Sequence, residues 1–347
     1  MTRRLVKLVL RSVAARVYGA STRFRAHLTG KVLIPMYHRV IPRSELATTF
    51  VQPGMYVTPE TFERHLRFFM THFKLLSFHE LLEMWHQGSW DTTVRYCAIT
   101  FDDGWLDNHL YAYPLLRAYR VPATIFLPTE LIGTREWLWP DRLGDLLHRS
   151  RGATGILREA LAPLTGQYPG LIAVSGRGAT AAFDSLIEQA KTLPEQARDN
   201  LLDSLSQAPG LQVADGRRLL NWDEVREMSD HGVAFGSHTC THADLTRLGR
   251  DQLQRELQQS LDILRRQRVN HVPVLAYPNG DYTDAIVAEA RAAGYRAAVT
   301  AHPGLESSRP ADLFRLKRIG VHDDVSRSVP LLTFHLARRA RRATEIV

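Results

Sequence analysis

Short apolar runs that end in polar residues, separated by stretches with helical spacing, recur along this chain and constrain its fold more than any other feature. Lys31–Tyr37 is one such run and ends before His38, and Arg95–Phe101 is another and ends before Asp102 and Asp103. Strands that alternate with helices form a mostly parallel sheet or barrel, with the active residues at the carboxyl ends of the strands. The sequence therefore predicts an α/β fold.

The remaining elements continue this alternation. Further strands are expected at 123–127, 233–236, 274–277 and 297–300, and helices at 59–72, 81–87, 108–120, 223–231, 251–267 and 283–293. Thr58 is expected to cap the first helix, with Pro59 at its first position. The region from about 134 to 220 breaks the alternation, because it contains glycines, prolines and helical pieces but no convincing strand. We interpret it as a largely helical insertion that could form one wall of a substrate cleft.

Basic residues are concentrated at the two ends of the chain. Of the 347 residues, 44% are hydrophobic and 23% are charged, which suits one large α/β domain or two medium ones and argues against disorder. Much of the net charge of +8 lies in segments 1–30 and 326–347. The chain has no zinc-finger, helix-turn-helix or aromatic RNA-binding signature, so we expect no nucleic-acid partner. Attraction to anionic lipid headgroups explains the basic ends at least as well.

The N-terminal segment, residues 1–30, has an amphipathic pattern. Leu5, Leu8, Val9, Val13 and Val17 suit one face of a helix, while basic residues interrupt the apolar run. The run is too short to span a bilayer and is not a convincing signal peptide. Such a helix can lie on a membrane surface or pack on the domain itself, and the two readings are about equally supported.

The chain contains two cysteines, Cys97 in an expected buried strand and Cys240 in a polar loop. A disulfide framework is therefore not expected, and a reducing compartment fits this usage. We expect a cytoplasmic location, with peripheral contact at the inner membrane face through the basic N-terminal segment. The oligomeric state is left open.

Two adjacent carboxylates, Asp102 and Asp103, follow the strand that ends at Phe101. Neighbouring carboxylates are costly to bury unless a cation neutralises one of them or their pKa values are driven apart. At the bend between a strand and a loop, both side chains can face the same site. In isolation the pair followed by Gly104 would be better interpreted as a turn.

A second polar cluster, Ser237-His238-Thr239-Cys240-Thr241-His242, follows the strand expected at 233–236. Two histidines four residues apart would lie on one face of a helical turn, a spacing that suits chelation of one metal ion. Two imidazoles and one carboxylate, with a position left open for water, form a familiar catalytic zinc arrangement. The sequence therefore predicts a divalent-metal hydrolase site.

The chain resembles the polysaccharide deacetylase family, also called the NodB-homology domain or carbohydrate esterase family 4. TFDDG at 100–104 is similar to the first family motif, SHTCTH at 237–242 to the second, and LAYPNGDY at 275–282 to the third. YHRV at 37–40 resembles the opening barrel strand of a subgroup found among exopolysaccharide enzymes. The resemblance covers roughly residues 31–325 apart from the insertion. It implies a distorted (β/α)7-type barrel flanked by the basic segments 1–30 and 326–347.

The resemblance also implies a role for each motif residue. Asp102 would be the general base that activates water. Asp103, His238 and His242 would hold the metal. The backbone N–H of Asn279 would help polarise the acyl oxygen.

Amide hydrolysis also needs an acid for the departing amine. His322 lies roughly where the family has its last-motif histidine, and it is our candidate for that acid. A loop histidine beside two aspartates, Asp323 and Asp324, is nearly as good a description of it.

The sequence departs from the family pattern in two places. The third motif often begins with an arginine that tethers the base, but this position is Ala276 here. Either another residue orients Asp102, or the site is held less tightly. The tract after Thr300 also lacks the usual tryptophan-bearing fourth motif, which implies a subgroup with a modified acid-base arrangement.

Three further residues are candidate substrate contacts: His38, Tyr277 and Trp139. His38 should lie at a strand end near the cleft, although a core or turn role is about equally supported. Trp139 and the neighbouring Trp137 and Asp141 could form a wall on which sugars stack. For those tryptophans a core role is the more common case.

These observations together predict a metal-dependent hydrolase that removes an N-acetyl group from an amino sugar of a polysaccharide, an oligosaccharide or a glycan precursor. Zn²⁺ is the expected metal, although the same ligands accept Co²⁺, Ni²⁺ or Fe²⁺. One alternative is a hydrolase of the same fold that acts on a non-sugar amide or an O-acyl ester. Another is a glycan-binding protein without catalytic activity, for which the missing arginine argues mildly.

Overall fold

The computed structural model describes residues 28–149, 179–207 and 216–342. These residues form two compact units. The first comprises the described parts of Met1–Pro42, Gly54–Arg135 and Arg218–Val347, and the second those of Arg43–Pro53 and Glu136–Arg217. Most of the N-terminal segment and parts of the predicted insertion lie outside the described residues. No helix in the described ranges is long and apolar enough to cross a membrane.

A curled sheet of seven parallel strands forms the centre of the first unit. Its order is β11 (Ala297–Val299), β10 (His271–Ala276), β9 (Ala234–Ser237), β8 (Ala123–Leu127), β7 (Ile99–Phe101), β2 (Pro35–Tyr37) and β12 (Ile319–Gly320). The predicted α/β fold, a distorted barrel, is therefore confirmed. Because all the strands run in parallel, their carboxyl ends meet at one edge of the sheet.

Two of the predicted strands are interrupted, and their halves belong to different sheets. The first half of each lies in a small sheet of β1 (Val32–Leu33), β6 (Tyr96–Cys97) and β5 (Lys74–Leu75), whereas β2 and β7 enter the central sheet. Pro35 has no N–H group and is the first residue of β2, where a missing donor is tolerated. A further pair joins β3 (Arg39–Val40) to β4 (Tyr56–Val57).

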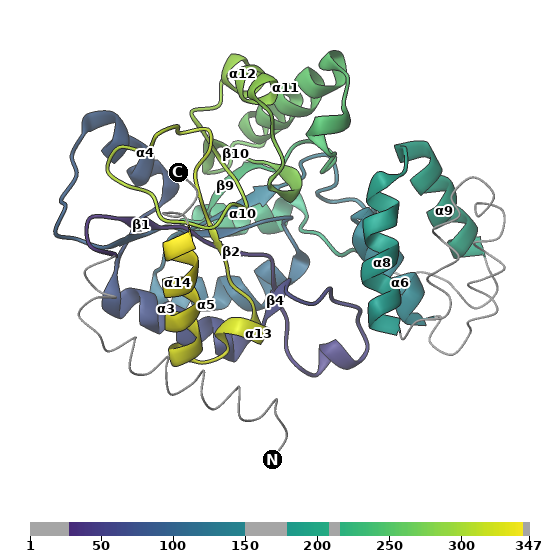
Figure 1. The fold of residues 1–347 in the computed structure, drawn as a ribbon, viewed down its shortest axis with the longest axis horizontal. Helices are drawn as coiled ribbons and strands as arrows, with labels where there is room; N and C mark the ends of the chain where they lie inside the picture. The colour runs from purple at the N-terminus through teal and green to yellow at the C-terminus, as the bar shows by residue number, and fades with distance from the viewer. Residues whose placement is uncertain (1–27, 150–178, 208–215, 343–347) are drawn as a thin grey trace. The chain divides into compact units, whose positions relative to one another are not determined.

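Helices follow the strands around the sheet. They are α3 (Pro59–His72), α4 (Phe78–Gln87), η2 (Asn108–Ala112, a π-helix), α5 (Tyr113–Tyr119), α10 (Trp222–Asp230), η4 (Leu245–Arg247), α11 (Arg250–Arg266), η5 (Pro278–Gly280), α12 (Asp284–Ala292), α13 (Asp323–Ser326) and α14 (Val329–Arg342). In the view of Figure 1, α11 and α12 lie above the strands, whereas α3, α5 and α14 lie below them. The cap predicted for α3 is confirmed, because the Thr58 side chain accepts a hydrogen bond from the Thr61 N–H.

The apolar face of α11 is buried against the sheet. Leu257 and Leu261 are fully buried and contact residues of β10 and α12 in one cluster. Burying a leucine side chain contributes about 1.5–3 kcal/mol, so this face anchors α11. The anchored helix places Glu256 beneath the loop that follows β9.

The second unit is helical in its described part. It contains η1 (Glu45–Ala47), α6 (Trp139–Arg149), α8 (Ala179–Thr192) and α9 (Glu195–Gln207). Leucines from the three α-helices form its core, among them Leu146, Leu186 and Leu201. This apolar cluster is separate from the clusters around the sheet.

Candidate metal centre and active site

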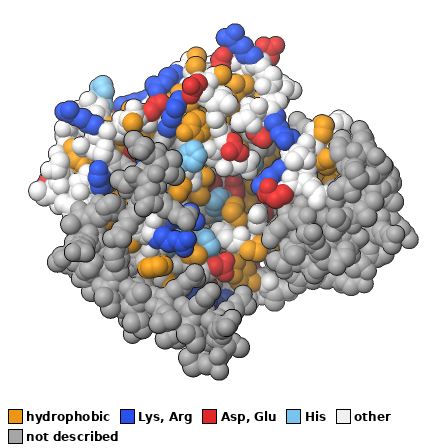
Figure 2. All heavy atoms as spheres, in the orientation of Figure 1, with side chains coloured by type: hydrophobic (Ala, Val, Ile, Leu, Met, Phe, Trp, Pro, Cys, Tyr) orange, Lys and Arg blue, Asp and Glu red, His pale blue; other side chains and the backbone are white. Residues whose placement is uncertain are grey.

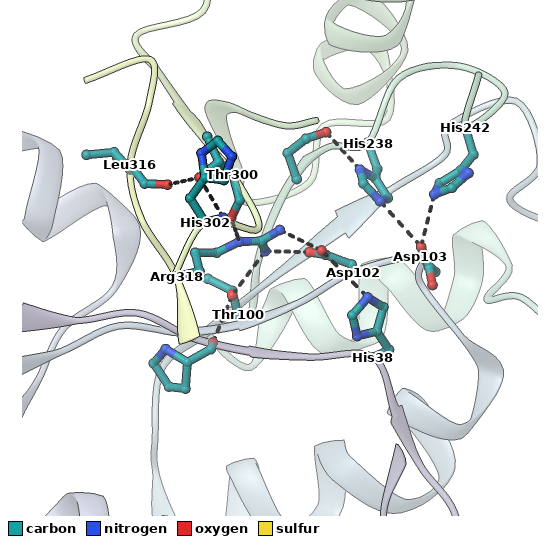
Figure 3. A network of polar contacts seen from close by, with 12 residues as sticks. His38, Thr100, Asp102, Asp103, His238, His242, Thr300, His302, Leu316 and Arg318 are labelled. Carbon is teal, nitrogen blue, oxygen red and sulfur yellow. Dashed lines mark hydrogen bonds and ion pairs between the residues drawn. The ribbon is translucent and has the colours of Figure 1, made fainter. Parts of the chain in front are cut away.

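Polar side chains from three strand ends meet at the carboxyl edge of the central sheet. Asp102 and Asp103 follow β7, His238 and His242 follow β9, and His38 follows β2. Figure 3 shows these side chains pointing toward one another. Figure 2 shows histidines and carboxylates gathered near the middle of this face of the molecule. The structure thus assembles in space residues that lie far apart in the sequence.

Asp103, His238 and His242 form a compact set of metal donors. The Oδ1 atom of Asp103 lies 3.3 Å from the Nε2 atom of His238 and 3.5 Å from the Nε2 atom of His242. One donor atom from each residue lies within 4.8 Å of the others. Donors that bind one ion tetrahedrally at about 2.0–2.2 Å lie about 3.3–3.6 Å apart. The triad is therefore consistent with a divalent metal ion.

The backbone of the donor loops is unusual. Asp103 and His242 have φ angles of 72° and 62°, in the left-handed region that side chains other than glycine rarely adopt. Thr239 also lies there, at 67°. The predicted helical turn at 238–242 is therefore wrong, because these residues form a bend. The bend, rather than helical periodicity, brings the two imidazoles to a centroid separation of 4.7 Å.

Glu256 on α11 holds this bend in place. Its carboxylate accepts hydrogen bonds from the backbone N–H groups of Cys240, at 2.8 Å, and Thr241, at 3.0 Å. It also accepts one from the Thr241 hydroxyl, at 2.9 Å. A buried carboxylate that receives several hydrogen bonds is a strong anchor, so the loop's left-handed geometry is supported from below.

A backbone contact fixes the tautomer of His238. Its Nδ1 lies 2.8 Å from the carbonyl oxygen of Ala276, which can only accept, so Nδ1 carries the proton and donates it. Nε2 is then the ring nitrogen that faces Asp103, to which it donates a hydrogen bond when it is protonated. Metal-binding histidines are commonly oriented in this way by a carbonyl or carboxylate behind them.

Asp102 is clamped by a residue that the sequence did not reveal. Arg318 donates to both carboxylate oxygens of Asp102, at 2.7 Å each, and its side chain is 1% exposed. Its Nε–H donates to the carbonyl oxygen of Thr300 at 2.9 Å (Figure 3). The arginine missing at Ala276 is thus replaced by one that arrives just before β12. The only sequence signal was a charged pair, Lys317 and Arg318, between the apolar residues that lead to His322.

The surroundings of the two aspartates keep both ionised. Burial alone would raise the pKa of the Asp102 carboxyl, but the charge and hydrogen bonds of Arg318 outweigh burial and hold it below its usual range. Burial likewise opposes ionisation of Asp103, but the hydrogen bond from His238 and the neighbouring imidazoles hold its pKa well below the usual range. Burial, followed by the charge of His238, lowers the pKa of His242 to about 4. Neutral His242 and ionised Asp103 are the forms that bind metal.

His38 lies beside the base. Its Nε2 is 4.0 Å from the Oδ2 atom of Asp102, and its backbone carbonyl accepts a hydrogen bond from the Asn108 side chain at 2.8 Å. His38 is partly exposed, with 15% of its side chain accessible. It is therefore within reach of a group bound next to Asp102.

The candidate acid, His322, and the candidate oxyanion donor, Asn279, lie at the same edge of the sheet but on other strands. Register pairs Gly320 of β12 with Met36 of β2, and His322 and His38 follow these two neighbouring strands. The His322 Nδ1 atom lies 3.4 Å from the Oδ2 atom of Asp324. Asn279 is exposed after β10 with a φ angle of 58°. Of the site residues predicted from the sequence, the structure thus brings together His38, Asp102, Asp103, His238 and His242.

Two candidate substrate contacts, Tyr277 and Trp139, pack into apolar cores. The side chain of Tyr277 is 1% exposed, and its hydroxyl donates to the carbonyl oxygen of Phe314 at 3.0 Å, so the ring belongs to the core. Trp139 belongs to the second unit, where it packs against the core of that unit under the guanidinium of Arg198. Both have the structural role that is more common for such aromatic residues.

The sequence matches the family model described as Polysaccharide deacetylase over residues 90–162 and 181–298, more than half of the chain. A curated Bacillus subtilis protein that carries the family's name, YxkH, is 23% identical over 230 residues, or 66% of this chain. The matched region spans about half of that relative's length, 53%.

Solved structures with the same fold include three bacterial proteins. Streptococcus pyogenes deacetylase PplD, solved in complex with acetate, is 22% identical with a TM-score of 0.55, and the match covers 88% of this chain and 99% of that one. IcaB from Ammonifex degensii is 16% identical with a TM-score of 0.54, covering 88% and 97%. BC0361, a polysaccharide deacetylase from Bacillus cereus, is 18% identical with a TM-score of 0.52, covering 89% and 69%. At these identities the likeness concerns the fold.

Proposed function

The chain belongs to the polysaccharide deacetylase family, and from that membership we propose that it is a metal-dependent hydrolase that removes the N-acetyl group from an amino sugar of a polysaccharide, oligosaccharide or glycan precursor. One observation carries this proposal. A donor triad of Asp103, His238 and His242 lies beside a second carboxylate, Asp102, that is kept ionised and oriented by Arg318. A purely structural aspartate pair would need neither the two histidines beside Asp103 nor the arginine on Asp102.

Asp103, His238 and His242 would hold the metal ion. A divalent ion bound there supplies Lewis-acid activation of water and of the acyl oxygen. Zn²⁺ is our first choice because two imidazoles and one carboxylate suit it, and Co²⁺, Ni²⁺ or Fe²⁺ fit the same donors.

Asp102 would act as the general base. Figure 3 shows its side chain turned toward the cluster that contains Asp103, so it would face water held beside the triad. Arg318 occupies both of its oxygens, which fixes the direction in which the remaining lone pairs point. The carboxylate accepts the proton as the water oxygen attacks the acetyl carbon.

The later steps need an oxyanion donor and an acid. The backbone N–H of Asn279 is our candidate for the donor, because its left-handed conformation turns that peptide away from the strand. His322 is our candidate for the acid that protonates the departing amine. The pairing of β12 with β2 supports this assignment, because His322 follows β12, His38 follows β2, and His38 lies beside Asp102.

The geometry bears on the non-catalytic alternative. The absence of an arginine at Ala276 was the argument for a vestigial site, and Arg318 removes that argument. The cytoplasmic location and the membrane contact of segment 1–30 stay predictions, and equal co-sedimentation with anionic vesicles of the full chain and of a chain lacking residues 1–28 would contradict the contact.

Acetate release from a panel of N-acetylated and O-acetylated saccharides tests the proposal directly. The protein should be assayed after chelation and after reloading with Zn²⁺, Co²⁺, Ni²⁺ or Fe²⁺, with bound metal measured in each sample. We expect one metal per chain, activity that follows metal content, and a preference for N-acetyl substrates. A protein that binds no metal, or that is equally active without it, would overturn the proposal.

A further inference from the structure

The two oxygens of the Asp103 carboxylate have different partners. Oδ1 faces the Nε2 atoms of His238 and His242. Oδ2 accepts a hydrogen bond from the indole Nε1–H of Trp105 at 2.9 Å. A carboxylate with both oxygens free can bind a metal through one oxygen or through two. Here one of the two oxygens is already engaged.

The Trp105 ring is itself held from behind. Trp105 is 2% exposed, and its backbone forms a bridge with Leu219. The guanidinium of Arg39 lies over the indole, 4.4 Å from its centroid, and the Arg39 Nε–H donates to Asp107 at 2.7 Å. Arg39 and Asp107 are both buried. A stacked, ion-paired guanidinium of this kind restrains the ring, so the indole N–H stays directed at Oδ2.

Resting on the proposed function, we propose that Trp105 is a positioning residue that makes Asp103 a one-oxygen metal ligand. The hydrogen bond reserves Oδ2, so that Asp103 occupies one coordination position rather than two. A position that a second carboxylate oxygen would fill is thereby left for water or for the acyl oxygen of the substrate. Groups that hydrogen-bond to metal ligands commonly change metal affinity or activity 10- to 100-fold.

Two replacements of Trp105 separate the hydrogen bond from the packing. Trp105→Phe removes the N–H and part of the ring, whereas β-(3-benzothienyl)alanine at position 105 keeps the shape and replaces the N–H with sulfur. Trp85→Phe is the matched control, because the Trp85 indole also donates at 2.9 Å, to the carbonyl oxygen of Ser307 away from the site. The benzothienyl variant keeps the inference testable if Trp105→Phe does not fold.

The readout is the visible spectrum of the Co²⁺-loaded protein during titration with acetate, the product of the proposed reaction. We expect acetate to perturb the spectrum of the wild type and of Trp85→Phe. In both Trp105 variants, Co²⁺ should still bind, but with weaker absorption because a second oxygen of Asp103 joins the coordination. The apparent Kd for acetate should then rise at least about tenfold.

An unchanged spectrum and acetate affinity in the benzothienyl variant would overturn the inference. Failure of the wild type to bind Co²⁺ is a different result, because it would refute the proposed metal site itself. The two failures are therefore distinguishable in a single series of titrations.

Discussion

The two halves of the site are built in different ways. The metal half (Asp103, His238 and His242) comes from two short motifs, and each motif follows directly on a strand. The base half (Asp102, Arg318 and His38) comes from three separate segments, and Arg318 lies 216 residues from the carboxylate it clamps. Each motif of the metal half is a local sequence signal, and the order of the strands brings the two motifs together. In the base half, Arg318 and His38 carry no comparable local signal, so the order of the strands alone identifies them. The variants below test whether the halves are separable.

The largest effect is expected from His238→Ala, which removes a donor of the metal half. Metal binding should be lost, and activity should fall about 10³-fold or more, because a metal ion contributes several kcal/mol to the transition state. The measurements are metal content after dialysis and acetate release. Replacement of the exposed His86 by Ala is the control and should change neither. Retention of one tightly bound metal per chain by His238→Ala would remove this residue from the metal half.

Asp102→Asn should separate the halves most clearly. Loss of the general base should lower kcat about 10²- to 10⁴-fold. Bound metal should remain near one per chain, since Asp102 is not among the three donors. Metal content and acetate release should be measured on the same samples. If the Asp102→Asn variant matched the wild type in activity, the assignment of the base would fail.

Arg318→Lys should have a smaller effect of the same kind. A lysine keeps the positive charge but cannot donate to both oxygens as the planar guanidinium does, so kcat should fall about 10- to 100-fold with little change in KM. Metal content should be unchanged.

Arg318→Ala supplies the complementary measurement. It leaves a buried carboxylate unpaired and should destabilise the fold by about 3–5 kcal/mol. If it folds, millimolar ethylguanidine should restore part of kcat, as expected of a positioning group and not of a merely structural one. Absence of rescue together with normal kcat in Arg318→Lys would contradict the role of Arg318.

The smallest effect is expected on stability, from the buried His65 and the two hydrogen bonds that join it to β2 and α13. His65 on α3 accepts a hydrogen bond from the hydroxyl of Tyr37 on β2 and donates one to the carbonyl of Ser326 on α13. Burial lowers the pKa of His65 to about 4, so the folded protein keeps it neutral while the unfolded chain takes up a proton below about pH 6.5. The stability contributed by His65 is therefore complete above pH 6.5 and is lost between pH 6.5 and 4.

Between pH 7 and pH 5 this loss should reach about 2 kcal/mol, measured by denaturant unfolding. His65→Gln should weaken the pH dependence by about that amount, whereas His86→Gln, on an exposed residue, should leave it as it is. If the unfolding free energy of His65→Gln changed with pH as steeply as that of the wild type, protonation of His65 would not be the cause of the pH dependence.

The sequence predicted the helices better than the strands. The helices at 59–72 and 251–267 were expected within a residue or so, because their apolar periodicity and caps are local signals. The strands at 31–37 and 95–101 were expected as single elements, but each divides between two sheets. The hydrophobic pattern does not reveal which neighbour a strand pairs with, because the residues of each run are buried in either sheet.

The site likewise divides into features that local sequence signals predicted and features that depend on tertiary contacts. The sequence alone determined the barrel class, the family and the two motifs that carry the metal half, because each motif is a short run of residues at a strand end and can be recognised without its partner. It did not determine the bend at 238–242, whose left-handed residues depend on Glu256 below it. Nor did it identify Arg318, because the clamp on Asp102 depends on β12 pairing with β2 and β2 with β7. Only the tertiary structure decides that register, since it results from packing the whole sheet.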